Sequence, residues 1–434
     1  MFVALPLVIC IATVLAGAGE TANKTALGDE VARLVAQLDA RGLEQRDDAE
    51  RKLLAMGAAV LPLLPAVGDR TPAEVAQRVT RIQQKLLLAQ AAAAAEPTTV
   101  TLKGDDLSLA DALAAIAKQT GNPIVDHRTA FGEEKTDVKI KADFNKTPFW
   151  RAMDHVLDQA DLTLYGFAGQ RGAFVVSRPP DAVPRSGRAV YTGAFRLEPL
   201  RFEAMRDLRN ENSQALKFFL EVTWEPRLQP IAILQPLGKV TVVGDDGNPI
   251  EVTSADAEPE APIREGISAA ELDIPLTLPS RKIEKIRSLK GKLMALVAGP
   301  SHDFRFSHLT PLARNARPER VEQRQAGATV TIDQVRKNNQ VWEVALRVKF
   351  DEPSGALESH RGWVLENETF FQNSAGERFE PGGFEQTRQS KDEVGLNYYF
   401  DLKDGPEKLE FVYRTPITIL EVNVDYEFRD LNLP

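Results

Sequence analysis

One pattern of a strand followed by a helix occurs twice between residues 98 and 177. The alternating segment Val100–Asp105 precedes a helix that Ser108 and Asp111 can cap, and Val138–Asp143 precedes a helix that begins near Thr147-Pro148. The apolar positions of the two helices correspond one for one: Leu109, Ala112, Leu113, Ile116 and Ala117 in the first, and Phe149, Ala152, Met153, Val156 and Leu157 in the second. Because an amphipathic helix must bury its apolar stripe, residues 98–177 are predicted to form a small duplicated βαβ domain, completed by strands at "NPIV", "LTLYGF" and "GAFVVSR".

The loops before these helices argue against a nucleotide site. They read "GDDLS" and "ADFNKT", without the glycine-rich pattern that lets backbone amides surround a phosphate. Their aspartates would also repel a phosphate.

The segments "VTLKGDDLSLADALAAIAKQTGNPIV" and "VKIKADFNKTPFWRAMDHVLDQADLTLY" resemble the short N-terminal domain (STN) shared by secretins and TonB-dependent outer-membrane receptors. The resemblance covers about residues 98–177, and no barrel-forming or ring-forming region of those families follows it here. In those families the domain is a periplasmic docking piece. The resemblance therefore implies binding of an envelope protein without catalysis, with strand addition at a sheet edge as one route.

Residues 26–95 are predicted to be helical. Apolar residues recur at helical spacing from Val31, and Thr71-Pro72-Ala73-Glu74 has the composition of a capped helix start. The stretch "LVAQLDARGLEQRDDAERKLLAMGAAVLPLL" resembles HEAT-like helical repeats of bacterial surface proteins. Since a solenoid needs about three or more repeats, a single unit favours a packing element over a binding surface.

The C-terminal half follows a proline-rich linker at 177–188 and consists of short alternating runs separated by turn signals. We predict two antiparallel, immunoglobulin-like β-sandwiches, at 189–311 and 327–434. The segments "WEPRLQP" and "YEFRDLNLP" in this half resemble the β-rich tails of bacterial envelope proteins, a resemblance that implies no particular activity. The predicted fold class is thus a multidomain α+β protein with an N-terminal helical segment, a small duplicated domain and two sandwiches.

The N-terminus predicts export. An apolar run from Phe2 to Leu15 precedes Ala16-Gly17-Ala18, which fits a cleavage site, so residues 1–18 are predicted to be a signal peptide. The expected location is periplasmic or at the cell surface; the alternative is a chain tethered by an uncleaved anchor. The only cysteine, Cys10, lies in this segment, so no disulfide is expected in the mature chain, and no later segment is long and apolar enough to span a bilayer.

The net charge and the motifs of the sequence limit the functions that can be expected. With 53 basic and 62 acidic residues and a net charge of -9, the chain lacks the overall positive charge that favours binding to a phosphate backbone. Nucleic acid is therefore not an expected partner. No nucleophile elbow or H-E-x-x-H zinc motif occurs. We therefore expect no catalytic residues, no metal site and no cofactor, while the sequence leaves the oligomeric state open.

The sequence is compatible with two functions. The first is a non-catalytic envelope adaptor that docks a protein partner. The alternative is a β-sandwich carbohydrate-binding protein or metal-dependent hydrolase. Its candidate residues are the histidines His127, His155, His302 and His308, the carboxylates Asp126, Asp154, Glu251, Asp273, Asp303, Glu343 and Glu366, and the tryptophans Trp150, Trp224, Trp342 and Trp363.

Overall fold

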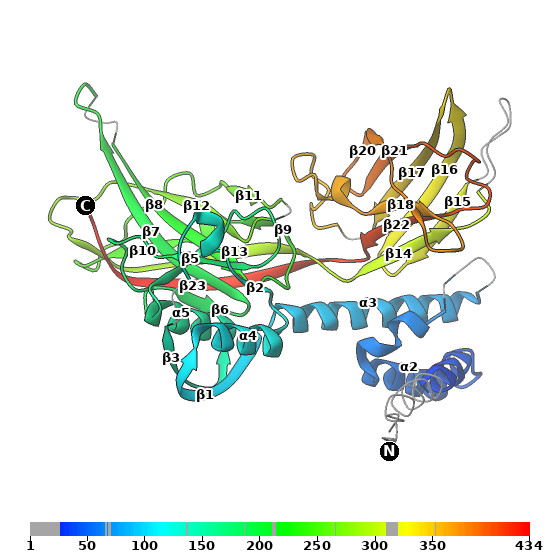
Figure 1. Cartoon of the computed structure of the whole chain (residues 1–434), viewed down its shortest axis with the longest axis horizontal. Coiled ribbons are helices and arrows are strands. Elements are labelled where there is room, and N and C mark those ends of the chain that lie inside the picture. Colours follow the sequence, from blue (N-terminus) through cyan, green and yellow to red (C-terminus); the bar gives the residue numbers. More distant parts are fainter. Residues whose placement is uncertain are drawn as a thin grey trace, which may run out of the picture.

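The computed structural model describes residues 27–65, 67, 71–135, 138–185, 187–210, 214–264, 266–309, 320–351 and 353–434. Over these residues the chain is mixed α+β, with few helices and mostly antiparallel sheets, as predicted. Figure 1 shows two β units along the long axis, with the small α/β part below the first of them and helix α3 below the second. None of the helices in these ranges is long and apolar enough to cross a membrane. The predicted signal peptide and Cys10 lie outside the described residues.

Residues 99–177 form a compact part that we call the module. Its elements are β1 (Thr99–Ser108), α4 (Leu109–Thr120), β2 (Ile124–Asp126), η2 (Arg128–Phe131), β3 (Lys139–Pro148), α5 (Phe149–Gln159), β4 (Leu162–Tyr165) and β5 (Ala173–Ser177). Strands β1 and β3 pair as a two-stranded antiparallel sheet, and the other strands form a three-stranded sheet in the order β2-β5-β4. The two helices pack against both sheets in one core.

The duplication holds at a constant spacing of 40 residues, from β1 and α4 to β3 and α5. The strand alignment suggested by the sequence pattern was therefore wrong by two residues, because Val100 corresponds to Ile140 and not to Val138. The first helix start is confirmed, since the Ser108 hydroxyl accepts a hydrogen bond from the Asp111 amide at 3.0 Å. At the second start Pro148 itself is the N-cap and no side chain caps the helix.

The N-terminal helical segment packs on the second β unit. It contains a helix at 27–37, α2 (Leu43–Ala55), the 3-10 helix η1 (Gly57–Leu63) and α3 (Ala73–Ala95). Helix α3 begins at Ala73 with Pro72 as its N-cap, one residue later than the N-cap predicted at Thr71. Its stripe of Val75, Val79, Ile82 and Leu86 enters the same core as Phe304 and Phe306.

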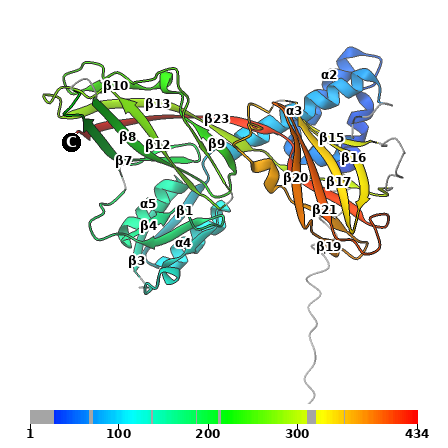
Figure 2. The ribbon, with the colours of Figure 1, turned by 90° about the horizontal axis from the view of Figure 1, so that it is seen from above.

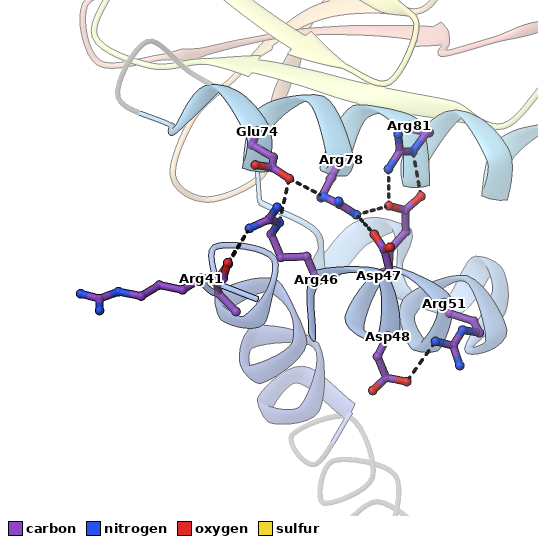
Figure 3. A network of polar contacts seen from close by, with 10 residues as sticks. Arg41, Arg46, Asp47, Asp48, Arg51, Glu74, Arg78 and Arg81 are labelled. Atoms are coloured by element: carbon purple, nitrogen blue, oxygen red, sulfur yellow. Dashed lines mark hydrogen bonds and ion pairs between the residues drawn. The ribbon is translucent and has the colours of Figure 1, made fainter. Parts of the chain in front are cut away.

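A network of ion pairs joins α2 to α3 (Figure 3). Arg78, which is buried, contacts Glu50 and Asp47 at 2.8 and 2.9 Å, and Arg81 also binds Glu50. Hydrogen bonds from Arg81, opposed by burial, hold the pKa of Glu50 below its ordinary value. Ion pairs therefore join the helices of this segment to one another, and apolar packing joins the segment to the second β unit.

The first β unit consists of two sheets around one core. One sheet has the order β12-β8-β7-β6, and the other has the order β10-β13-β9-β11 with β23 paired to β13. The strands are β6 (Val190–Thr192), β7 (Phe195–Arg206), β8 (Gln214–Trp224), β9 (Pro230–Leu234), β10 (Thr241–Gly244), β11 (Glu260–Pro262), β12 (Ala269–Leu276), β13 (Lys285–Ala298) and β23 (Ile419–Asn432), with a 3-10 turn η3 (Leu237–Lys239).

The second β unit also has two sheets, in the orders β14-β22-β18-β19 and β15-β16-β17-β21-β20. Its elements are β14 (Ser301–Phe306), β15 (Val321–Gln325), β16 (Ala328–Asn338), β17 (Val341–Phe350), η4 (Trp363–Glu366), β18 (Thr369–Gln372), β19 (Arg378–Phe379), β20 (Gly383–Gln389), β21 (Glu393–Phe400) and β22 (Glu410–Pro416).

The predicted boundary between residues 311 and 327 does not separate these units. Strand β14, placed by sequence in the first unit, pairs with β22 of the second, and β23, placed in the second unit, pairs with β13 along 285–298. Figures 1 and 2 show β23 running back across the first unit. The chain passes between the units at 299–300 and again at 417–418, and these two segments are hydrogen-bonded to each other. The Gly299 amide donates to the Thr418 carbonyl and the Ile417 amide donates to the Pro300 carbonyl, both at 3.0 Å. Two antiparallel connections therefore join the units where the sequence predicted one linker.

Candidate docking surface

The module is fixed to the first β unit by a buried ion pair. Arg196 of β7 is fully buried, and its Nε donates to the Asp154 carboxylate of α5 at 2.9 Å. The hydroxyl of Tyr191 also donates to Asp154, at 2.5 Å, and burial together with the Asp154 charge raises the pKa of Tyr191. Next to this pair, the indole of Trp150 donates to the Ala194 carbonyl at 3.1 Å. Asp154, a candidate for chemistry by sequence, is thus a structural contact.

A second fixed contact surrounds Glu225, which is fully buried at the end of β8. Its carboxylate accepts hydrogen bonds from the amide and hydroxyl of Thr98, from the Asn122 side chain and from Arg227, at 2.7 to 3.1 Å. Residue Thr98 precedes β1 and Asn122 follows α4, so both ends of the first repeat are tied to the β unit. The module is therefore presented in one orientation.

Each strand of the two-stranded sheet is capped at one backbone position by a glutamine side chain. Gln119 of α4 accepts from the Thr101 amide at 2.9 Å and donates to the Thr101 carbonyl at 3.1 Å. Gln159 of α5 makes the equivalent pair with Lys141, at 2.9 and 3.0 Å. Each glutamine amide takes the place that a neighbouring strand would occupy. An incoming strand, the route suggested from the sequence, would have to displace these glutamines at Thr101 and Lys141.

The outward face of the three-stranded sheet carries exposed apolar side chains. Val175 points into the module core, so its neighbour Phe174 points to the opposite face. The strand register places Val125 and Tyr165 directly beside Phe174. Val125 is 39% exposed, whereas Phe174 is buried beneath its neighbours.

Two loops extend this face. His127 lies between β2 and η2, the turn η2 contributes Phe131, and the hairpin loop between β4 and β5 contributes Phe167. Phe131 is 52% exposed and Phe167 is 62% exposed. We call the set Val125, His127, Phe131, Tyr165, Phe167 and Phe174 the aromatic face.

The rings of the aromatic face form a continuous chain of edge-to-face contacts. The centroids are 5.3 Å apart for Phe174 and His127, 5.7 Å for His127 and Phe131, 5.2 Å for Phe131 and Tyr165, and 6.3 Å for Tyr165 and Phe167. These spacings match the favoured geometry of aromatic pairs. A side-chain arrangement that is held in place before binding loses little entropy when a partner arrives, which suits the centre of a protein interface.

Sequence reasoning missed the aromatic face. Its residues lie in the segments "DHRTAF" and "YGF", which each follow a strand. Neither segment shows a regular spacing of apolar residues, because loops have no fixed periodicity. Asp126, another candidate, binds Arg128 at 2.9 Å, and this hydrogen bond is the main cause that lowers the pKa of Asp126.

The remaining candidates are dispersed. His155 lies 3.2 Å from the Lys141 carbonyl, and His302 packs on Phe304 in β14, where burial lowers the pKa of His302. His308 lies beyond the end of β14, so one strand does not hold both histidines. Across the described ranges, no group of three or more His, Cys, Asp or Glu side chains is arranged to hold a metal ion.

The candidate carboxylates and tryptophans mostly have structural contacts. Glu343 binds Arg336 at 2.8 Å and Asp273 binds Lys217 at 3.0 Å, while Asp303 binds Arg414. Trp224 and Trp342 are buried in the two β units, as their strand patterns predicted. Trp363, at η4 and not in a strand, is partly exposed but also packs against the core of the second unit.

Comparisons of the chain with protein-family models, curated proteins and solved structures found no match.

Proposed function

We propose that the protein is a non-catalytic, exported envelope protein that docks a protein partner through the aromatic face of its module. The observation that carries the proposal is the pair of exposed phenylalanines, Phe131 and Phe167, on a chain of packed rings. Aromatic residues are enriched where interfaces gain most of their binding energy, and exposed aromatic clusters are unusual on surfaces without a partner.

The occupant we propose is an apolar segment of another envelope protein. The aromatic face comprises six side chains, whereas a stable interface between whole domains involves about 20 to 30 residues a side. A cluster of this size suits a short segment that inserts a few apolar side chains between Phe131 and Phe167. The resemblance of residues 98–177 to the periplasmic docking domain of secretins and TonB-dependent receptors supports the same role.

In this proposal the two β units are immunoglobulin-like sandwiches that act as a frame. The Asp154–Arg196 pair and the Glu225 contacts support that role, because they join α5 and both ends of the first repeat to the first β unit. The N-terminal signal pattern supports export to the periplasm or the cell surface.

Site-specific photo-crosslinking tests the proposal. A benzoylphenylalanine is placed at position 131 or 167 of the full chain in its own cells, and at position 384 in a matched control. Phe384 is 45% exposed but lies on β20 of the second β unit. We expect one protein to be captured from 131 and 167 and not from 384, and its capture from 131 to be lost when Phe167→Ser is introduced.

Three results would contradict the proposal: no crosslinked protein, equal capture from position 384, or crosslinks only to a second copy of the chain. Deleting the whole module is a poorer test, because it would expose Arg196 and Glu225, which are buried against it.

A further inference from the structure

A row of three glutamates crosses the sheet of the first β unit on which the module packs. Glu221 of β8 lies directly opposite Glu198 of β7 on one side and directly opposite Glu271 of β12 on the other. Side chains that lie directly opposite in an antiparallel sheet project from the same face, with Cβ atoms about 5 Å apart. Because like charges at this spacing repel each other, three ionised carboxylates in one row need compensating positive charge.

Arginines bind the two outer carboxylates of the row. Glu198 accepts a hydrogen bond from Arg196 at 2.8 Å and lies 3.4 Å from Arg185. Glu271 accepts a hydrogen bond from Arg201, also at 2.8 Å. The repulsion between the outer members and their surroundings is thus compensated.

The middle carboxylate has no such partner. No hydrogen bond or ion pair joins Glu221 to another residue in the part of the chain that the structure describes. Two of the arginines are shared with further carboxylates, since Arg196 also binds Asp154 and Arg201 also binds Glu203. An ionised Glu221 would therefore add a negative charge for which no arginine remains.

The module covers this carboxyl group. Glu221 is partly buried and lines a cavity of about 10 Å³ between the first β unit and the module. Trp150, Tyr165 and Phe174 of the module line the same cavity. A cavity of this size holds no more than one water molecule, so docking of the module removes hydration that the carboxylate would have in water.

The surroundings of Glu221 favour its neutral form. Burial raises the pKa of Glu221, the charges of Glu198 and Glu271 add to this rise, and those of Arg185 and Arg196 oppose it. The charged and titratable groups around the row are Arg185 in the linker, Tyr191 on β6, Arg196 and Glu198 on β7, Glu271 on β12, and Asp154 and Tyr165 on the module. A group whose pKa is raised in the folded state stabilises that state below its ordinary pKa, and this stabilisation is lost as the pH rises through the raised value.

We propose that protonation of Glu221 controls how firmly the module is held on the first β unit. The neutral carboxyl adds no charge to the row, so the module stays docked through the Asp154–Arg196 pair. The carboxylate is an unpaired charge beneath the module, and separation of the module hydrates it, so the junction opens more often at higher pH. The inference concerns the attachment of the module and does not depend on the docking function.

Hydrogen exchange of the Ser268 amide tests this proposal, because that amide donates to the Gly166 carbonyl of the module at 3.1 Å across the junction. The full chain is studied by NMR between about pH 4 and pH 8, and protection factors correct for the intrinsic effect of pH on exchange. We expect the protection of Ser268 to fall by at least about threefold over this range, since half a pKa unit corresponds to about that factor in an equilibrium constant. The Ile250 amide, which donates to the Val242 carbonyl within the first β unit at 2.9 Å, should keep its protection.

Three variants assign the effect to the row. Glu221→Gln should keep the protection of Ser268 constant over the whole range. The matched control Glu203→Gln, at an exposed glutamate of β7, should retain the pH dependence of the unmodified chain. Glu271→Gln leaves Glu221 in place but removes a neighbouring negative charge, so the fall in protection should move to lower pH.

Four results would overturn the proposal. The first two are a protection of Ser268 that does not change with pH, and an unchanged fall of that protection in Glu221→Gln. The third is a fall that stays at the same pH in Glu271→Gln, which would show that the row does not set the titration. The fourth is a loss of protection at Ile250 together with Ser268, which would indicate unfolding of the whole first β unit and not opening of the junction.

Discussion

Replacing Arg196 with methionine is expected to destabilise the junction between the module and the first β unit strongly. Methionine fills much of the same space but leaves the Asp154 carboxylate, which is buried, with Tyr191 as its remaining partner. Removing one member of a buried ion pair costs about 3 to 5 kcal/mol, because the other charge stays buried without compensation. Glu198 is also bound by Arg196 at 2.8 Å, and its other ion pair among the described residues is with Arg185 at 3.4 Å.

Equilibrium urea unfolding measures this loss, with tryptophan fluorescence as the signal. Trp150 lies at the junction through its bond to Ala194, so it reports on separation of the module. The matched control is Arg201→Met in the same strand, where an exposed arginine pairs with Glu203 and Glu271. We expect this control to change the unfolding free energy little, because water screens exposed pairs.

A second variant separates charge from packing. In Arg196→Met/Asp154→Leu no unpaired carboxylate remains at position 154, so the double variant should be more stable than Arg196→Met alone. The reasoning is refuted if Arg196→Met costs less than about 1 kcal/mol, or if the double variant is less stable than the single variant by the full cost of Asp154→Leu.

Two further predictions concern the module and its support. Burial raises the pKa of Glu221 above its ordinary 4.5, so the folded state favours the protonated form and loses stability as pH rises through that raised pKa. Glu221→Gln should therefore stabilise the protein by about 1 kcal/mol at pH 7 and not at pH 4, as thermal melts at both pH values would show; an equal effect at both would contradict the assignment. Gln159→Ala should speed hydrogen exchange of the Lys141 amide, and Gln119→Ala should speed that of the Thr101 amide. Each variant should leave the other amide unchanged. Faster exchange at both amides in either variant would contradict this prediction and indicate a general loosening of the module.

The local pattern predicted the elements of the module well. Alternation and helical spacing are properties of neighbouring residues, so the apolar stripes from Leu109 and Phe149 are buried as expected. The strand correspondence failed by two residues because alternation repeats every two positions, and a shift of two leaves the pattern unchanged. The contact of Gln119 with Thr101, repeated by Gln159 with Lys141, gives the strands the same spacing of 40 residues that the two helix stripes have.

The aromatic face could not be predicted in the same way. Phe131 and Phe167 lie in different loops, 36 residues apart in the sequence, and the sheet order β2-β5-β4 brings the loops together. Contacts between distant loops depend on which surfaces pack together, and the periodicity of the sequence does not predict them.

The sequence alone determined that this chain is a β-rich α+β protein with a duplicated module, since strand and helix periods are local and each element must bury one face. The tertiary structure decided which strands belong together. β14 and β23 have strand patterns that fit either β unit, and only the hydrogen-bonding edges offered by β22 and β13 assign them. Backbone N–H and C=O groups can pair with any neighbouring strand edge, because they are the same for every side chain. The sequence pattern therefore does not show which β unit a strand joins.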